Sequence, residues 1–196
     1  MYNILYIILA IYLIVLIILA TEFTAYMWHL WGAHSDIVPG VHSTHREHHV
    51  ADLDHKAHGD FFWVILLLIV FGCVLFWLNH RGYPEYIYSN LIDETGYNNT
   101  LVQSGLGAFY LIVVAVFTWN WYIHQAYHTK DHWLNKFDWF KKDKKIHFQH
   151  HVDPKVNYGI ASHFSDVIFG TYDNPIESEV YSKLNVPNLF KDINLE

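Results

Sequence analysis

The chain has 196 residues, which suits one domain and leaves little room for a second catalytic module. Hydrophobic residues make up 53% of it and charged residues only 16%, below the roughly 25% of ordinary soluble domains, so much of its surface is expected to face something other than water. The formal net charge of −7 has the wrong sign for a protein that neutralises nucleic-acid phosphates, so nucleic acid is not an expected partner.

Three apolar runs in the sequence are suited to crossing a membrane. Residues 1–20 carry no charge and, continued to Trp28, exceed the ~20 residues that a helix needs to cross a bilayer. Residues 61–78 and 105–123 are also uncharged. Tryptophans fall near the ends of the runs, where aromatic rings prefer the headgroup region. The sequence therefore predicts an all-α integral membrane bundle of three spans, with a fourth if residues 82–104 also enter the bilayer.

The distribution of positive charge orients these spans. Three crossings place residues 22–60 and 124–196 on one side of the membrane and residues 79–104 on the other. The first side holds all the lysines and arginines except Arg81, which assigns it to the cytoplasm. We therefore expect a bacterial inner membrane or endoplasmic reticulum protein with its N-terminus outside. A cleavable secretion signal is less favoured, because residues 1–3 contain no lysine or arginine.

Two cytoplasmic segments follow the last span. The segment His132–Phe148 interleaves aromatic residues with five lysines, which is typical of a helix lying in the membrane surface. A solvated amphipathic helix packed on protein has the same pattern. The lysine-rich residues 136–145 are also a candidate docking face for an acidic protein. Residues 173–196 have mixed charge and are expected to form a tail outside a membrane-embedded domain of residues 1–172.

Histidine is the unusual residue type, with 16 copies, of which all but His80 lie on the predicted cytoplasmic side. Ten form four boxes: His29 and His34; His45, His48 and His49; His124 and His128; His147, His150 and His151. Residues at i, i+3 and i+4 share one face of a helix, so each triplet can aim three imidazoles at one point. His29 and His34 are five residues apart, so that pair requires a local bulge or a helix end.

Ten imidazoles are too many for one metal ion and suit two ions with five or six ligands each. Neutral imidazole binds iron, zinc, copper and nickel. A structural or pH-sensitive histidine cluster is the alternative interpretation. Glu47, inside the first triplet, is a candidate hydrogen-bond partner for a ligand or an exposed salt-bridging residue. The remaining cytoplasmic histidines are expected to support the ligands or lie on the surface: His42, His55, His58, His132 and His163.

The boxes HLWGAH, HREHH, HQAYH and HFQHH, with NYG at 157–159 and DVIFGTY at 166–172, resemble the fatty acid hydroxylase superfamily. This group includes fatty acyl and sphingolipid hydroxylases, sterol desaturases and carotene hydroxylases. The resemblance implies a non-haem centre of two iron ions, held by the ten box histidines, that uses dioxygen to hydroxylate an unactivated C–H bond of a lipid. It also implies that four residues after the last box shape the site without binding metal: Asn157, Gly159, Asp166 and Gly170.

The resemblance leaves several matters open. The short separation of His34 from His45 is nearer the carotene hydroxylases, whereas the end of the motif set is nearer the acyl and sterol branch, so fatty acyl, sphingolipid, sterol and carotenoid substrates all stand. We expect electrons to come from a separate donor protein. Three spans are fewer than the four usual in the family, so a homodimer is a further expectation.

Three other interpretations compete with lipid hydroxylation. A lipid desaturase with the same metal centre is the closest alternative. A non-enzymatic, histidine-rich membrane protein that binds metal is more distant. Iron is the expected metal, and zinc is an alternative occupant of the isolated protein. A metal transporter is disfavoured because no predicted span carries a charged residue or a histidine in its middle.

Overall fold

The computed structural model describes residues 2–50, 58–83 and 99–174, and every regular element in these ranges is a helix. This confirms the expected all-α class. Two helical stretches are long and apolar enough to cross a membrane, Ile7–Ala33 and Gly105–Tyr127.

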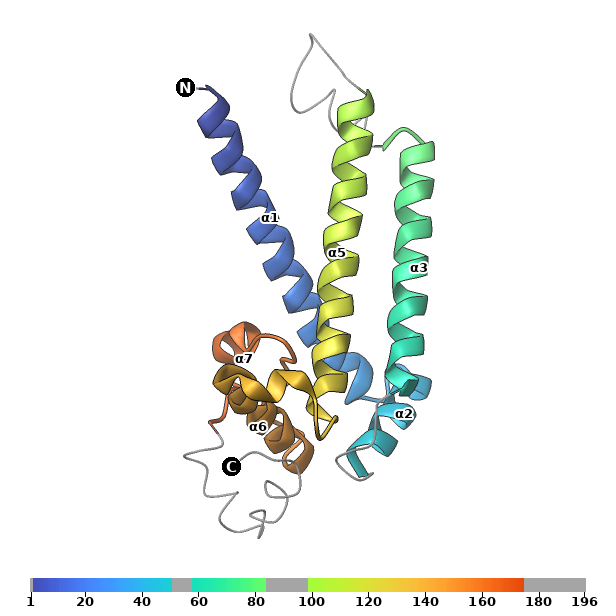
Figure 1. Ribbon diagram of the computed structural model, residues 1–196. Coiled ribbons are helices and arrows are strands. Elements are labelled where there is room, and N and C mark those ends of the chain that lie inside the picture. The colour runs from blue at the N-terminus through green and yellow to red at the C-terminus, as the bar shows by residue number, and fades with distance from the viewer. Residues whose placement is uncertain (1, 51–57, 84–98, 175–196) are drawn as a thin grey trace.

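Three long helices cover the three predicted spans. They are α1 (Tyr2–Met27), α3 (His58–His80) and α5 (Asn99–Tyr127). α5 contacts both of the others, and α1 diverges from it toward the N-terminus (Figure 1). The N-terminus lies at the same end of the bundle as the end of α3 and the start of α5.

The surface of α1 is apolar and exposed along most of its length. Ile4, Ile8 and Tyr12 have exposed fractions of 65%, 58% and 58%, and Leu16 remains 42% exposed one turn later. A helix that is apolar all round is normally buried, either in the core of a large protein or in lipid. Because protein covers so little of α1, its surface fits a hydrocarbon environment.

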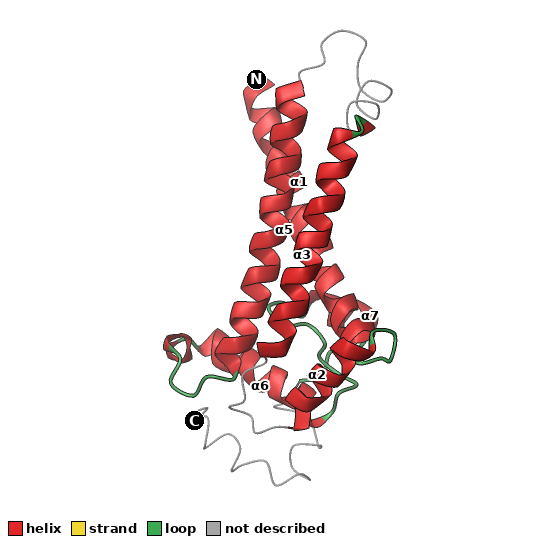
Figure 2. Cartoon of the chain, turned by 90° about the vertical axis from the view of Figure 1, so that its right-hand side faces the viewer, coloured by secondary structure: helices red, strands yellow, loops and turns green. Residues whose placement is uncertain are grey.

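The shorter helices gather at the other end of the bundle and form a cap, which Figure 2 shows from a second direction. A six-residue π-helix, η1 (Trp28–Ala33), continues α1. It is followed in the cap by α2 (Pro39–Val50), α6 (Asp138–Val152) and α7 (Phe164–Phe169). The boxes in η1, α2 and α6 and at the end of α5 therefore meet in one region.

The predicted helix over residues 132–148 is broken. A short 3-10 helix, η2 (Trp133–Lys136), precedes Phe137, whose extended backbone separates it from α6. The aromatic side chains divide accordingly: Trp133 and Trp139 are exposed, whereas Phe140 is fully buried. Phe140 packs in a core cluster that joins α5 to α6 and comprises Ile123, Ala126, Tyr127, Leu134 and Phe140.

Lys144 also differs from the expectation of a surface lysine, because its side chain is fully buried. Its Nζ donates to the Thr129 carbonyl at 3.1 Å and to Asn135 Oδ1 at 3.5 Å. Burial lowers the pKa of Lys144 to about 8. The side chain thus ties the turn after α5 to α6, and both of these helices carry box histidines.

We expect Lys144→Met to lower the free energy of unfolding by about 1–3 kcal/mol, because it leaves the half-buried Thr129 carbonyl without its donor. Denaturant unfolding in detergent measures the change. Lys142→Met, at an exposed position on the same helix, is the matched control. Equal stability of the two variants would contradict this role for Lys144.

Candidate metal centre

The ten box histidines converge in two groups of five. In each group the ligand-type nitrogens all lie within 4.8 Å of one another. We call them group A, which comprises His29, His34, His45, His49 and His150, and group B, which comprises His48, His124, His128, His147 and His151. The groups are adjacent, since the rings of His49 and His151 stack with centroids 4.3 Å apart. Two histidine groups that could each hold a metal ion are therefore present.

The sequence predicted that each triplet can aim its three imidazoles at one point. In the structure each triplet is instead divided between the two groups. Within α2, His45 and His49 belong to group A, and His48 belongs to group B. Helical geometry allows this division, because residues four apart differ by about 40° around the axis, whereas neighbours differ by about 100°. α6 repeats the arrangement with the groups exchanged, because His147 and His151 belong to group B and His150 to group A. Each triplet thus bridges the two groups.

The irregularity expected between His29 and His34 is the π-helix η1. The His34 amide donates to the His29 carbonyl at 3.1 Å, an i to i+5 hydrogen bond. The wider turn brings residues five apart onto one face, and the two rings have centroids 5.0 Å apart. Gly32 lets the Trp28 ring pack closely against the backbone of η1, because a Cβ there would lie 3.0 Å from that ring.

The spacing of the Nε2 atoms matches a particular coordination geometry. In group A, neighbouring Nε2 atoms are 2.9–3.1 Å apart, and in group B they are 2.9–3.2 Å apart. With metal–nitrogen bonds of about 2.1 Å, donors at right angles lie about 3.0 Å apart, whereas tetrahedral donors lie about 3.4 Å apart. These neighbouring pairs therefore match the right-angle spacing of octahedral donors.

The electrostatic environment keeps these rings neutral. Burial and, to a smaller extent, neighbouring histidines lower the pKa of His34 to about 2 and that of His49 to about 3. Burial likewise holds the pKa of His147 and His151 well below the usual range. Neutral imidazole is the form that binds metal, so no proton has to leave these side chains at pH 7.

Backbone carbonyls fix the orientation of two group A histidines. His29 Nδ1 donates to the Tyr158 carbonyl at 2.5 Å, and His150 Nδ1 donates to the Val156 carbonyl at 2.6 Å. A ring that donates through Nδ1 presents an unprotonated Nε2 to the group. Residues 156–158 therefore select the tautomer that metal binding requires.

Asp166 in turn holds this loop in place. Its carboxylate accepts hydrogen bonds from the Tyr158 and Gly159 amides, each at 2.8 Å, and from Thr171 Oγ1. Burial alone would raise the pKa of Asp166, but these hydrogen bonds and His163 lower it, so the group is ionised. A Cβ at Gly159 would lie 2.6 Å from Asp166 Oδ2, so only glycine fits there.

Three further residues were expected from sequence to shape the site or to assist a ligand, and they differ in burial and contacts. Asn157 is buried with a left-handed φ of 55°, which asparagine tolerates, and its side chain bonds the backbone of Asp173 at 2.9 Å. Gly170 ends α7 with a φ of 69°. Glu47, the carboxylate considered from sequence, is exposed.

The remaining histidines serve elsewhere. His42 makes a hydrogen bond to the carbonyl of Ala33, the last residue of η1, and the His132 side chain caps the N-terminus of η2. His163 lies between two carboxylates, 3.5 Å from Asp143 and 3.6 Å from Asp166. His80 is exposed at the far end of α3, His55 lies outside the described residues, and nothing is described of the His58 side chain.

Sequence reasoning missed a polar connection inside the bundle. Asn120 of α5 donates to Glu22 of α1 at 2.8 Å, and Glu22 also accepts from Ser162 at 3.2 Å. Asn120 Oδ1 accepts from the Ala161 amide, so the loop before α7 is tied to both long helices. Its one sequence signal is Glu22 itself, the first charged residue of the chain, in an otherwise apolar helix.

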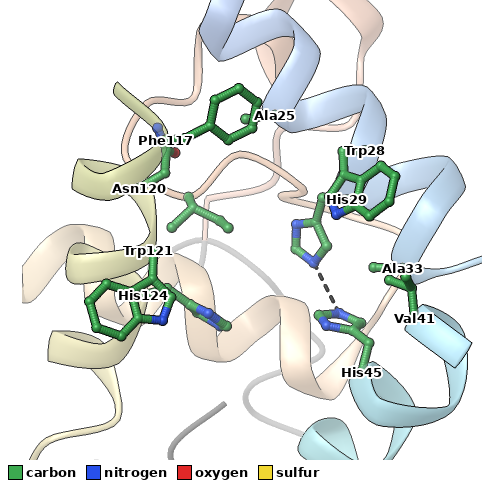
Figure 3. A pocket seen from close by; sticks show the side chains of 11 residues that line it. Ala25, Trp28, His29, Ala33, Val41, His45, Phe117, Asn120, Trp121 and His124 are labelled. Atoms are coloured by element: carbon green, nitrogen blue, oxygen red, sulfur yellow. Dashed lines mark hydrogen bonds between the residues drawn. The ribbon is translucent and has the colours of Figure 1, made fainter. Parts of the chain in front are cut away.

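A small apolar cavity of about 70 Å³ lies beside both groups. Its walls include His29, His45 and His124, together with Phe117 and Trp121 (Figure 3). A second apolar cavity of about 270 Å³ lies between α1, α3 and α5, and Phe117 lines this one too. A third, lined by His34, His49 and Arg46 among others, reaches group A from a more polar side.

Comparisons with protein-family models, with curated proteins and with solved structures found no match for this chain. The functional argument therefore depends on the site itself.

We expect Asp166→Asn to weaken divalent-metal binding at group A by about 10–100-fold, because the loop that orients His29 and His150 loses an anionic acceptor. Group B, whose ligands do not bond this loop in the described contacts, should keep its affinity. Metal titration by calorimetry distinguishes the two sites. Asp138→Asn, on an exposed carboxylate, is the control. Equal weakening of both sites would contradict a role specific to group A.

The His163 ion pairs predict a pH-dependent stability. Burial lowers the pKa of His163, but the two carboxylates outweigh it and raise the pKa from 6.5 to about 9. The charged form therefore stabilises the fold by about 3 kcal/mol below pH ~6.5, and this contribution disappears as the pH rises to ~9.

We therefore expect the stability difference between the wild type and His163→Gln to be largest at pH ~6 and to shrink toward pH ~9. Unfolding in detergent across this range measures it, with His80→Gln as the control at an exposed histidine. A difference that stays constant with pH would show that His163 is not charged in the folded protein.

Proposed function

We propose that this chain is an integral membrane oxygenase in which groups A and B hold two iron ions and a lipid C–H bond is hydroxylated with dioxygen. On this proposal the chain belongs with the fatty acid hydroxylase superfamily, and the ten grouped histidines are its metal ligands. The observation that carries the proposal is the pair of adjacent five-imidazole groups with octahedral Nε2 spacing.

The donor set favours iron over zinc. Structural zinc takes four ligands and catalytic zinc usually takes three, with a tetrahedral arrangement in both cases. Five imidazoles at octahedral spacing suit a metal that prefers higher coordination and keeps one position open. When bound there, a pair of iron ions supplies the activation of dioxygen and the oxidation of an unactivated C–H bond.

The cavities support an apolar substrate. The cavity beside His29, His45 and His124 has mainly apolar walls, and the larger cavity between the long helices is lined by leucine, isoleucine and phenylalanine side chains with two threonines. Phe117, which is 6% exposed, lines both. A lipid chain that enters from the bilayer between the helices can thus approach the histidine groups through apolar contacts alone.

The membrane topology belongs to the same proposal. Besides the two stretches suited to crossing, α3 contains a shorter apolar stretch, Ile65–His80, and packs along α5. We propose that α1, α3 and α5 each span the bilayer, with the cap in the cytoplasm and the N-terminus outside. The excess of lysine and arginine in the segments that contain the cap supports this orientation.

Hydroxylation needs one dioxygen, two electrons and two protons for each alcohol and water formed. A separate donor protein provides the electrons, and the exposed Lys136 and Lys142 offer a surface for an acidic partner. The chain's own residues hold the metal-binding rings neutral and oriented, and they line the apolar cavity beside these rings.

Two alternatives differ in chemistry. A desaturase would use the same residues and remove two hydrogen atoms instead of inserting oxygen. A metal-binding protein without enzymatic activity would have no use for an apolar cavity between the metal groups and the membrane helices, so the cavity favours an enzyme.

Expression in a host of defined lipid composition, with a competent electron donor, tests the function. Mass spectrometry of the lipids should detect the gain of one oxygen atom, or the loss of two hydrogens for a desaturase. Anaerobic analysis should find two irons per chain. His150→Ala should abolish the product and His80→Ala, at an exposed histidine, should not. Unchanged lipids in every candidate class, or tight zinc without turnover, would contradict the proposal.

Phe117→Ala joins the two apolar cavities, so we expect the modified carbon to move along the lipid chain or longer chains to be accepted. The position of the new hydroxyl or double bond, read by fragmentation in the mass spectrometer, measures the effect. Phe76→Ala is the control, because Phe76 is 72% exposed and lines neither cavity. The same product position in both variants would show that Phe117 does not set substrate depth.

A further inference from the structure

The short helix α7 has its polar and apolar sides reversed relative to a helix on a soluble protein. Its buried residues are Ser165 and Asp166, at 3% and 0% exposure. The four apolar side chains point outward with exposed fractions of 46–65%, namely Phe164, Val167, Ile168 and Phe169. A surface helix in water normally turns its apolar side to the core and its charged side to solvent. α7 therefore presents an apolar face whose exposure to water would be unfavourable.

This reversal is fixed by the site. Asp166 faces inward because its carboxylate holds the Tyr158 and Gly159 amides of the loop that orients group A. The left-handed Gly170 ends the helix, and the Thr171 and Tyr172 amides both donate to the Asp166 carbonyl. With these bonds made, Val167 and Ile168 have to point outward. The helix cannot rotate to bury them without releasing Asp166.

The apolar face of α7 continues the apolar surface of α1. The Phe169 ring stacks on Phe23 with centroids 5.7 Å apart and on Tyr26 with centroids 5.5 Å apart. Phe23 and Tyr26 lie within the stretch Ile7–Ala33 that is suited to crossing a membrane. Figure 1 shows α7 beside the cap end of α1, on the side away from α3.

The depth of α7 follows from the length of α1. A helix that enters the hydrocarbon core near Ile7 leaves it about 20 residues later, since each residue advances 1.5 Å and the core is about 30 Å thick. Phe23 and Tyr26 are then at the boundary between acyl chains and headgroups. α7, which stacks on both, lies at the same level.

We propose that α7 is a bilayer-inserted interfacial helix, with Phe164, Val167, Ile168 and Phe169 in the acyl region of the leaflet beside the cap. The lipid surface is the partner that fits, because the exposed side chains of α7 carry no charge and are contiguous with the lipid-facing side of α1. A face of four side chains is too small for a stable contact with a second copy of the chain, which buries about 1,000 Å² or more in total.

The proposal has a structural consequence for the histidine groups. Asp166 links α7 to the loop that carries the Tyr158 carbonyl, and that carbonyl accepts from His29. α7 therefore anchors the group A side of the cap at a set depth, next to the leaflet from which an apolar substrate would come.

Spin labels at α7 test the proposal without any need for enzymatic activity. The single cysteine is replaced by Cys73→Ala, and a nitroxide is attached at Val167→Cys or Ile168→Cys, both exposed positions. The full chain is reconstituted in vesicles of phosphatidylcholine and phosphatidylglycerol. Collision of the label with dioxygen, which concentrates in lipid, is compared with collision with a water-soluble nickel chelate.

Two control positions define the scale. Ile11→Cys, 56% exposed on α1, reports lipid, and Ser43→Cys, exposed on α2, reports water. We expect labels at 167 and 168 to favour dioxygen over the chelate several-fold more than the label at 43 does. Labels at 167 and 168 that favour the chelate, or that are shielded from both reagents as in a protein contact, would overturn the proposal. A chelate-accessible label at 11 would instead refute the membrane topology as a whole.

Discussion

The crowding of imidazole nitrogens is the constraint on which the rest of this structure depends. In groups A and B, Nε2 atoms of neighbouring rings lie 2.9–3.2 Å apart, and in His29 and His150 the Nδ1 protons are committed to backbone carbonyls. Where both facing nitrogens are unprotonated their lone pairs repel, and burial disfavours the charged imidazolium that would relieve the repulsion. A shared cation resolves the conflict, which is why we interpret both groups as metal sites.

The fold brings these rings together by using each helix for both groups. α2 contributes His45 and His49 to group A and His48 to group B, and α6 does the reverse. Two metal ions held in this way would be coupled mechanically, because neither helix can move without disturbing both groups. The supporting contacts extend outward from the loop at residues 156–159 through Asp166 to α7, and from Asn120 through Glu22 to α1.

Much of this architecture could be predicted because its physical signals are local. The three long helices follow from uncharged runs of bilayer length, and the ten histidines follow from their spacing on helices. An irregularity between His29 and His34 was required by their separation, although its form as a π-helix was not determined. The boundary of a C-terminal tail after residue 172 stays a prediction, as do the electron donor and the homodimer.

The parts that could not be predicted depend on contacts between distant segments or on backbone atoms. The division of each triplet between two groups depends on how α2 faces α6, which no local pattern encodes. Every residue has a backbone carbonyl, so the sequence could not indicate that those of Val156 and Tyr158 accept hydrogen bonds from the histidines. The break at Phe137 and the inward turn of Lys144 were missed because the alternation of aromatic residues and lysines resembles a continuous surface helix.

X-ray absorption spectroscopy of the bound metal, together with metal analysis, tests the central claim most directly. The protein is loaded with metal to saturation in the absence of oxygen. The account predicts two ions per chain, each with five or six nitrogen or oxygen neighbours at about 2.1 Å and the scattering pattern of several imidazoles. One ion per chain, or a four-coordinate tetrahedral shell, would contradict it.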